Sequence, residues 1–142
     1  MGLLTGKKAL IFGVANDHSI AWGIAQALHR EGATLGFSYA GEKFERRVRP
    51  LAESLDSTFI EPCDVSKDEE IAAIVEKTRE QFGEVDILVH SIAFANRDDL
   101  SGPYHTVSRS NFALAMDVSV YSFTALASAY LPLMKPGGSM LT

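Results

Sequence analysis

The turn Gly13–Gly23 has residue types and a spacing suited to binding a diphosphate. It follows the short apolar run Ala9–Phe12 and leads into a segment of helical periodicity that ends at Gly32. The unpaired N–H groups and the partial positive charge at the start of such a helix favour an anion set against Ser19 and Ile20. Ser19 stands where the Gly-x-Gly-x-x-Gly pattern has its middle glycine, and the turn before it is longer than usual.

Two interpretations of these residues stay open at this stage. In the first, Gly13 lets the backbone come close to a phosphate and the Ser19 hydroxyl donates to it. In the second, Gly13 makes a tight turn and Ser19 caps the helix. Asp64 presents the same choice, because its carboxylate either accepts the amino group of an adenine or starts a turn before Ser66.

The elements around these residues alternate between short apolar runs and longer helical segments, which is typical of βαβ units. The predicted strands are Ala9–Phe12, Leu35–Tyr39, Thr58–Cys63, Ile87–His90 and a fifth that starts at Ser139. The predicted helices are Ile20–Glu31, Glu42–Leu55 with a break near Pro50, one opened by a Ser66-x-x-Glu69 capping box, and Ser108–Met134.

Apolar residues at consecutive positions suit strands covered on both faces, so the sheet is expected to be parallel. We therefore predict an α/β fold, a doubly wound Rossmann-like sheet with strand order 3-2-1-4-5, cut off after the start of the fifth strand. This order places Asp64 and Val65 on the adenine side of a dinucleotide. It places Ser91-Ile92-Ala93, whose small residues permit backbone approach, on the nicotinamide side.

Composition narrows the function classes. The chain has 142 residues, enough for one domain, and a formal net charge of −5 without a dense basic patch, which disfavours nucleic-acid binding. Cys63 is the single cysteine and indicates a reducing compartment and a buried, unreactive thiol. The four histidines have no spacing that forms a metal site or pairs one with a nucleophile, so no metal is expected.

The stretch from Val118 to Met134 carries no charged residue and approaches the length of a membrane span. Its serines, Thr124 and Pro132 favour instead a helix of a soluble protein, buried almost all round. The sheet is expected to cover one face, and a second subunit or the same chain the other. We predict no membrane association.

Beyond these general features, four segments together resemble one family. They are Gly13 with Ser19–Ala25, Cys63-Asp64-Val65, His90–Ala95 and Asp117–Ser122. The resemblance is to the NADH-dependent enoyl-[acyl-carrier-protein] reductases of bacterial and plastid type II fatty acid synthesis, a divergent branch of the short-chain dehydrogenase/reductases. It extends from Met1 to Thr142.

The resemblance implies a role for each matching position. Gly13, Ser19 and Ile20 would contact the pyrophosphate, Asp64 and Val65 the adenine, Ser91, Ile92 and Ala93 the nicotinamide side, and Ala95 the substrate. Position 40 holds Gln in some members and a basic residue in NADPH-preferring ones. Here Ala40-Gly41-Glu42 offers neither, which favours NADH, although Lys43, Arg46 and Arg47 lie close by in the sequence. The implied partner is an enoyl thioester on acyl carrier protein, in a cytoplasmic bacterial homo-oligomer, a tetramer by family habit.

The same resemblance places the catalytic Tyr and Lys beyond the fifth strand, so no catalytic residue is expected among these 142. Tyr39 and Lys43 have the Tyr-x-x-x-Lys spacing but follow the second strand, and we interpret them as unrelated to catalysis. Residues 1–142 are expected to form a single NAD-binding domain, the N-terminal part of a longer single-domain enzyme. Two alternatives remain: a short-chain dehydrogenase acting on a carbonyl or alcohol, and a nucleotide-binding fragment without catalysis.

Overall fold

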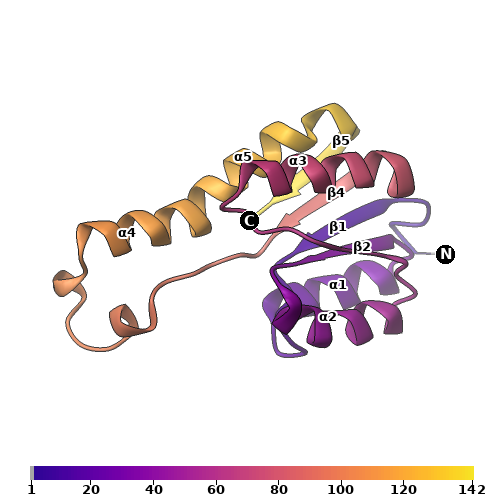
Figure 1. Cartoon of the computed structure of the whole chain (residues 1–142). Coiled ribbons are helices and arrows are strands. Elements are labelled where there is room, and N and C mark those ends of the chain that lie inside the picture. The colour runs from indigo at the N-terminus through magenta and orange to yellow at the C-terminus, as the bar shows by residue number, and fades with distance from the viewer. Residues whose placement is uncertain (1) are drawn as a thin grey trace.

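The computed structural model describes residues 2–142 and contains one five-stranded parallel sheet (Figure 1). Its order is β3-β2-β1-β4-β5, as predicted. The strands are β1 (Lys8–Phe12), β2 (Thr34–Tyr39), β3 (Phe59–Pro62), β4 (Val85–His90) and β5 (Met134–Leu141). Because β1 lies between β2 and β4, the chain reverses direction across the sheet there, which is where open α/β sheets form a crevice at their carboxyl edge.

Helices cover both faces of the sheet, so each face has its own apolar core (Figure 1). Helices α1 (Ile20–Arg30) and α2 (Glu42–Ser54) pack against one face, and α3 (Asp68–Lys77) and α5 (Ser122–Tyr130) against the other. Alternate residues of β1 enter the two cores, and all four residues from 9 to 12 are buried. The consecutive apolar run in the sequence has this physical cause.

At the amino edge of the sheet, the carboxylate of Asp86 in β4 links this strand to the start of β1. The Lys8 N–H donates to Oδ2 at 2.9 Å, and Lys7 Nζ lies 3.2 Å from Oδ1. Burial alone would raise the pKa of Asp86, but the Lys8 N–H and the ammonium groups of Lys7 and Lys135 outweigh it and hold the pKa below its ordinary value. The buried carboxylate is therefore ionised and paired.

Two helix boundaries differ from the prediction. Helix α2 runs through Pro50 without a break, because Pro50 is exposed and water can reach the carbonyl that its missing N–H leaves free. The predicted capping box is wrong: α3 starts at Asp68, and Ser66 Oγ donates to Asp64 at 2.6 Å rather than capping the helix. Glu70, not Glu69, reaches back, and its carboxylate accepts the Asp64 N–H at 2.7 Å.

Strand β5 also begins earlier than expected, at Met134 rather than Ser139. Residues 135–138, Lys-Pro-Gly-Gly, do not form a separate loop before the strand. They bulge out of it, since Met134 pairs with Val85 and Ser139 already pairs with Ile87. Gly137 has φ +80°, a conformation that glycine adopts readily.

The long apolar helix is the largest departure from the prediction. Arg109–Leu133 is one helix of 25 residues made of α4 (Arg109–Met116), the π-helical turn η4 (Asp117–Tyr121), α5 and the 3₁₀ turn η5 (Leu131–Leu133). The expectation that it is buried almost all round is wrong. No residue of α4 is buried, and α4 projects from the body as an arm, joined to it by the extended segment after β4 (Figure 1).

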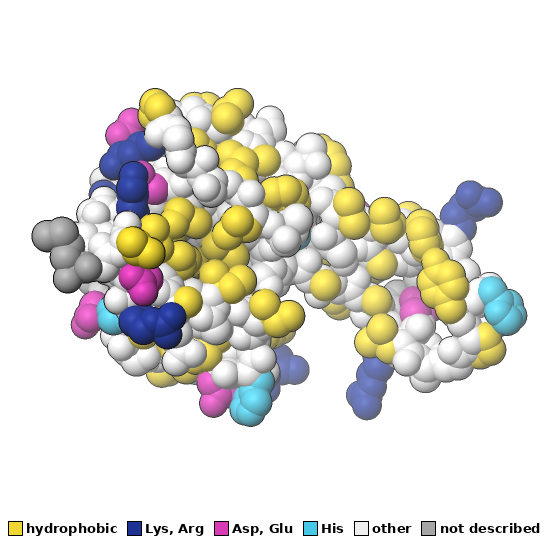
Figure 2. Space-filling view, turned by 180° about the vertical axis from the view of Figure 1, so that it is seen from behind, with side chains coloured by type: hydrophobic (Ala, Val, Ile, Leu, Met, Phe, Trp, Pro, Cys, Tyr) yellow, Lys and Arg dark blue, Asp and Glu magenta, His cyan; other side chains and the backbone are white. Residues whose placement is uncertain are grey.

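Apolar side chains line the surface of this arm, beyond a narrow waist between it and the body (Figure 2). They include Phe112, Leu114, Met116, Val120 and Tyr121, all exposed. The 25-residue helix is also long and apolar enough to cross a membrane. Length and composition alone do not indicate a membrane span, because helices of soluble proteins pass the same test. The turns η2 (Arg97–Leu100) and η3 (Tyr104–Thr106) lie in the connection from β4 to the arm, and η1 (Thr78–Phe82) extends α3.

Candidate functional site

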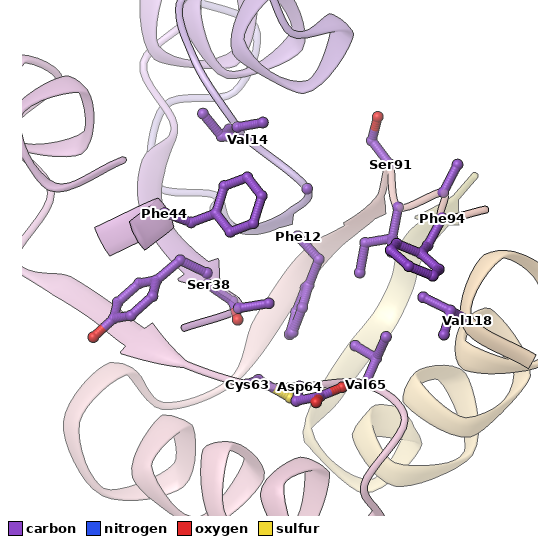
Figure 3. A pocket seen from close by; sticks show the side chains of 16 residues that line it. Phe12, Val14, Ser38, Phe44, Cys63, Asp64, Val65, Ser91, Phe94 and Val118 are labelled. Carbon is purple, nitrogen blue, oxygen red and sulfur yellow. The ribbon is translucent and has the colours of Figure 1, made fainter. Parts of the chain in front are cut away.

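A cavity of about 210 Å³ lies at the carboxyl edge of the sheet, over the ends of β1 and β4 (Figure 3). Six of the predicted site residues line it: Gly13, Asp64, Val65, Ser91, Ile92 and Ala93. In Figure 3 Asp64 and Val65 lie below Phe12, and Ser91 and Phe94 lie above it to the right. The topology thus brings together three segments that are far apart in the sequence.

Gly13 is constrained by the backbone of β4. It has φ +115°, and a Cβ at this position would lie 2.0 Å from the Ser91 carbonyl oxygen. The Ser91 N–H donates to the Phe12 carbonyl at 2.8 Å, so the β1–β4 ladder continues to the base of the cavity. The close approach seen in the structure is therefore between the two chain segments, which explains the glycine without any ligand.

The N-terminus of α1 is open. Ser19 is the residue that precedes the helix, and no side chain caps this end. The Ser19 Oγ instead accepts the N–H groups of Ala15 and Asn16 at 2.9 and 3.0 Å, which folds the long turn back on the helix start. Ile20, the first helical residue, is 80% exposed. The first N–H groups of a helix without a side-chain cap are available to an anion.

Asp64 forms the turn that the simpler interpretation predicted. Its Oδ1 accepts both the N–H and the hydroxyl of Ser66, at 3.0 and 2.6 Å, and these hydrogen bonds lower the pKa of the carboxyl group. The Asp64 carboxylate is therefore ionised, and its Oδ2 lies 3.7 Å from Lys67 Nζ. Asp64 can form this turn and also line the cavity, because Ser66 binds only one of its two carboxylate oxygens.

The opposite wall is the segment after β4. Ser91 and Ile92 are half-buried, and Ala93 and Phe94 are exposed toward the cavity. Ser119 in η4 holds this segment: its Oγ lies 3.0 Å from the Phe94 N–H, which donates to it, and 3.2 Å from the Phe94 carbonyl. Ala95, the predicted substrate residue, is half-buried and lies just past this wall, outside the cavity lining.

Sequence reasoning missed the apolar side chains that complete the cavity: Phe12, Val14, Phe44, Cys63 and Val118. Phe12 and Val14 are the sequence neighbours of Gly13, so the motif could have indicated them. Phe44 comes from α2, where no local pattern marks it. Val118 comes from η4 and lies within the segment Asp117–Ser122 that carries the resemblance, but no role was predicted for it, since only the packing of this helix brings it to the cavity. Burial raises the pKa of the Cys63 thiol to about 12, so the cysteine is the unreactive buried residue that was expected.

Tyr39 and Lys43, which have the Tyr-x-x-x-Lys spacing, are not paired in the structure. No hydrogen bond joins Tyr39 to Lys43 in the described residues, and burial together with Glu45 raises the pKa of Tyr39. Residues 2–142 also contain no group of three His, Cys, Asp or Glu side chains arranged to hold a metal ion.

Comparison with known families bears on this site. A family model described as Enoyl-(Acyl carrier protein) reductase matches residues 13–142, which include all three walls of the cavity. The chain belongs to this reductase family.

Members of the family match over almost the whole chain. The enoyl-[acyl-carrier-protein] reductase [NADH] FabI of Nostoc sp. is 49% identical over 142 residues, covering 98% of this chain and 55% of the relative. The crystal structure of the Aquifex aeolicus enoyl-[acyl-carrier-protein] reductase (NADH) superposes with a TM-score of 0.95 at 49% identity, over 98% of this chain and 56% of that one. The crystal structure of the Anaplasma phagocytophilum reductase in complex with NAD superposes with a TM-score of 0.93 at 46% identity, over 100% of this chain and 55% of that one. The chain therefore spans about half the length of the relatives it matches.

The Gly13 contact leads to a direct prediction. Gly13→Ala is expected to force β1 and β4 apart at the cavity and to lower the free energy of unfolding by about 2 kcal/mol or more. Chemical denaturation measures this effect.

Gly23→Ala in α1 is the matched control, since a Cβ there meets no atom within 4 Å. Alanine should stabilise this exposed helical position by up to about 1 kcal/mol. If both glycines tolerate alanine equally, the backbone approach of Gly13 to Ser91 does not constrain the site.

Proposed function

We propose that the protein is an NADH-dependent enoyl-[acyl-carrier-protein] reductase of fatty acid synthesis, and that these 142 residues form its cofactor-binding part. The observation that carries the proposal is the uncapped N-terminus of α1 beside a cavity at the switch point of the sheet. Family membership and the NADH named for the relatives support it.

The residues around the cavity fit a dinucleotide in their chemistry. The open helix end suits a diphosphate. The Ser19 hydroxyl accepts two N–H groups and donates to Asn16 Oδ1 at 3.4 Å, which folds the turn against the start of this helix. On either side, Asp64 and Val65 would meet the adenine, and Ser91, Ile92 and Ala93 the nicotinamide ribose. Gly13 and Ile20 would complete the pyrophosphate site, and Ala95 would contact the substrate.

The cofactor is proposed to be NADH rather than NADPH. Ala40, at the rim next to Tyr39, offers no charge to a 2′-phosphate. Lys43, Arg46 and Arg47 form, with Glu42, a shallow hollow of their own on α2, separate from the lining of the cavity. These cations lie on the solvent side of the helix, where water screens them.

The reaction needs walls that hold the nicotinamide ring and a hydrogen-bond donor for the enolate. NADH, when bound, supplies a hydride to C3 of the trans-2-enoyl thioester, and negative charge develops on the thioester oxygen. The walls described here would hold the nicotinamide ring and exclude water, with Ile92 and Phe94 as apolar contacts. A hydrogen-bond donor must stabilise the enolate, and the family resemblance places that tyrosine, with its lysine, beyond Thr142.

The wider setting is proposed from the same observations. Residues 1–142 would be the N-terminal part of a longer single-domain enzyme that works in the bacterial cytoplasm, in keeping with its single buried cysteine. An acyl carrier protein would deliver the substrate. The exposed apolar side chains of α4 and η4 favour a homo-oligomer, with a tetramer as the proposed form.

The reaction itself can be tested by following NADH oxidation with a crotonyl thioester. The full-length protein is expected to oxidise NADH, and the 142-residue chain alone is not, because it contributes no enolate donor. A β-ketoacyl thioester is the control substrate, and its reduction in place of the enoyl compound would favour a carbonyl dehydrogenase. Turnover of the crotonyl thioester by the 142 residues alone would contradict the proposed division of roles.

Association through the arm is measured by sedimentation velocity over a range of concentrations. We expect oligomers, and weaker association in Phe112→Ser, because serine removes apolar area from the arm. Leu3→Ser serves as the control, since Leu3 is also apolar and is more exposed than Phe112, at 90% against 45%, but lies at the other end of the body. A monomer at every concentration argues against the oligomer.

A further inference from the structure

His90 ends β4 directly before the cavity wall, and both of its ring nitrogens are engaged. The residue is only 2% exposed. Its Nε2 lies 2.7 Å from Ser122 Oγ at the start of α5, and its Nδ1 lies 2.9 Å from Thr142 Oγ1 just after β5. One imidazole therefore links the ends of two strands to the long helix.

The protons in this network can be assigned. Ser122 Oγ donates its single proton to the Val118 carbonyl at 2.6 Å, so in the 2.7 Å contact the His90 Nε2–H must be the donor. Burial lowers the pKa of His90, which keeps the ring neutral. The Nδ1 lone pair then accepts the Thr142 hydroxyl proton, and every polar group in the network is satisfied.

The network ends on the cavity itself. Val118, whose carbonyl accepts the Ser122 proton, lines the cavity from η4 (Figure 3). The neighbouring Ser119 binds Phe94 in the opposite strand-end segment. A π-helical turn shifts the register of a helix by one residue and recurs at functional sites. Here it presents Val118 and Ser119 to the wall, while His90 fixes Ser122, the residue that follows the turn.

We propose that His90 is a positioning residue for the nicotinamide half of the cofactor. In its Nε2–H form it ties the end of β4 to the helix after η4, and so sets where Ser91, Ile92 and Ala93 lie. The inference rests on the function proposed above. It assigns to His90 no contact with the cofactor and no proton transfer.

The topology makes the effect selective. His90 and the wall it fixes belong to the β4 side of the crevice, whereas Asp64 and Val65 come from the β3 side. Loosening the His90 network should therefore weaken binding of NADH but not of ADP, which has only the adenosine and diphosphate part. A purely structural role would weaken both ligands together.

The first measurement is the ¹⁵N spectrum of the protein labelled at histidine. A neutral His90 that carries its proton on Nε2 is expected. A neutral ring that carries the proton on Nδ1 would overturn the network, whatever ligand the protein binds.

The second measurement is calorimetry of NADH and of ADP with three variants of the network and one control. Ser122→Ala and His90→Phe remove the link and should weaken NADH binding about tenfold while ADP stays within about twofold. His90→Gln, which keeps a side-chain N–H donor, should recover most of the NADH affinity. His105→Gln, at an exposed histidine on the way to the arm, is the control and should change neither ligand.

Each outcome separates the two proposals. If the unaltered protein binds neither NADH nor ADP, the proposed function fails and the role of His90 fails with it. If it binds both and the variants lose both equally, or lose neither, the positioning role alone is overturned. Ser122→Ala covers the case in which His90→Phe does not fold, because it removes one oxygen and leaves the imidazole in place.

Discussion

The contact between Gly13 and Ser91 is the constraint on which the rest of the site depends. Two parallel strands whose helices lie on opposite faces diverge at their carboxyl ends, and here the backbones stay together one residue further. The Ser91 N–H reaches the Phe12 carbonyl at 2.8 Å, and the space for a Cβ on Gly13 is taken by the Ser91 carbonyl. The turn after β1 and the wall after β4 are thereby fixed relative to each other, with the start of α1 opening beside them.

The parallel sheet was predictable because burial on both faces puts consecutive apolar residues into β1 and β4. The doubly wound topology then predicts the strand order and the position of the cavity. The predictions that failed concern helix boundaries, where the same side chains can form more than one local set of hydrogen bonds. Ser66 had an acceptor in Asp64 that competed with its role as a cap, and Glu70 rather than Glu69 had the reach to bind the Asp64 N–H. Pro50 did not break α2, because solvent replaces the missing hydrogen bond at an exposed position.

The long helix shows a different limit. Its composition indicated burial, yet α4 and η4 expose Phe112, Met116 and Val120. A pattern of apolar residues indicates that a helix face will be covered, but it does not identify the element or subunit that covers it. The π-helical turn has no recognisable sequence pattern. The His90 network was not predictable either, since it depends on contacts between α5 and the ends of β4 and β5. Apolar cavity residues such as Phe44 and Val118 escaped notice for the same reason.

The central claim is that the exposed start of α1 binds a diphosphate, and Ile20→Glu tests it most directly by calorimetry with NADH. A carboxylate at this position favours the helix dipole, so the stability of the fold should stay the same or rise slightly, by up to about 1 kcal/mol. The same charge repels a diphosphate, so NADH affinity should fall at least about tenfold, whereas the uncharged Ile20→Gln should bind nearly as the unaltered protein does. Equal NADH affinity in Ile20→Glu and Ile20→Gln would contradict the account.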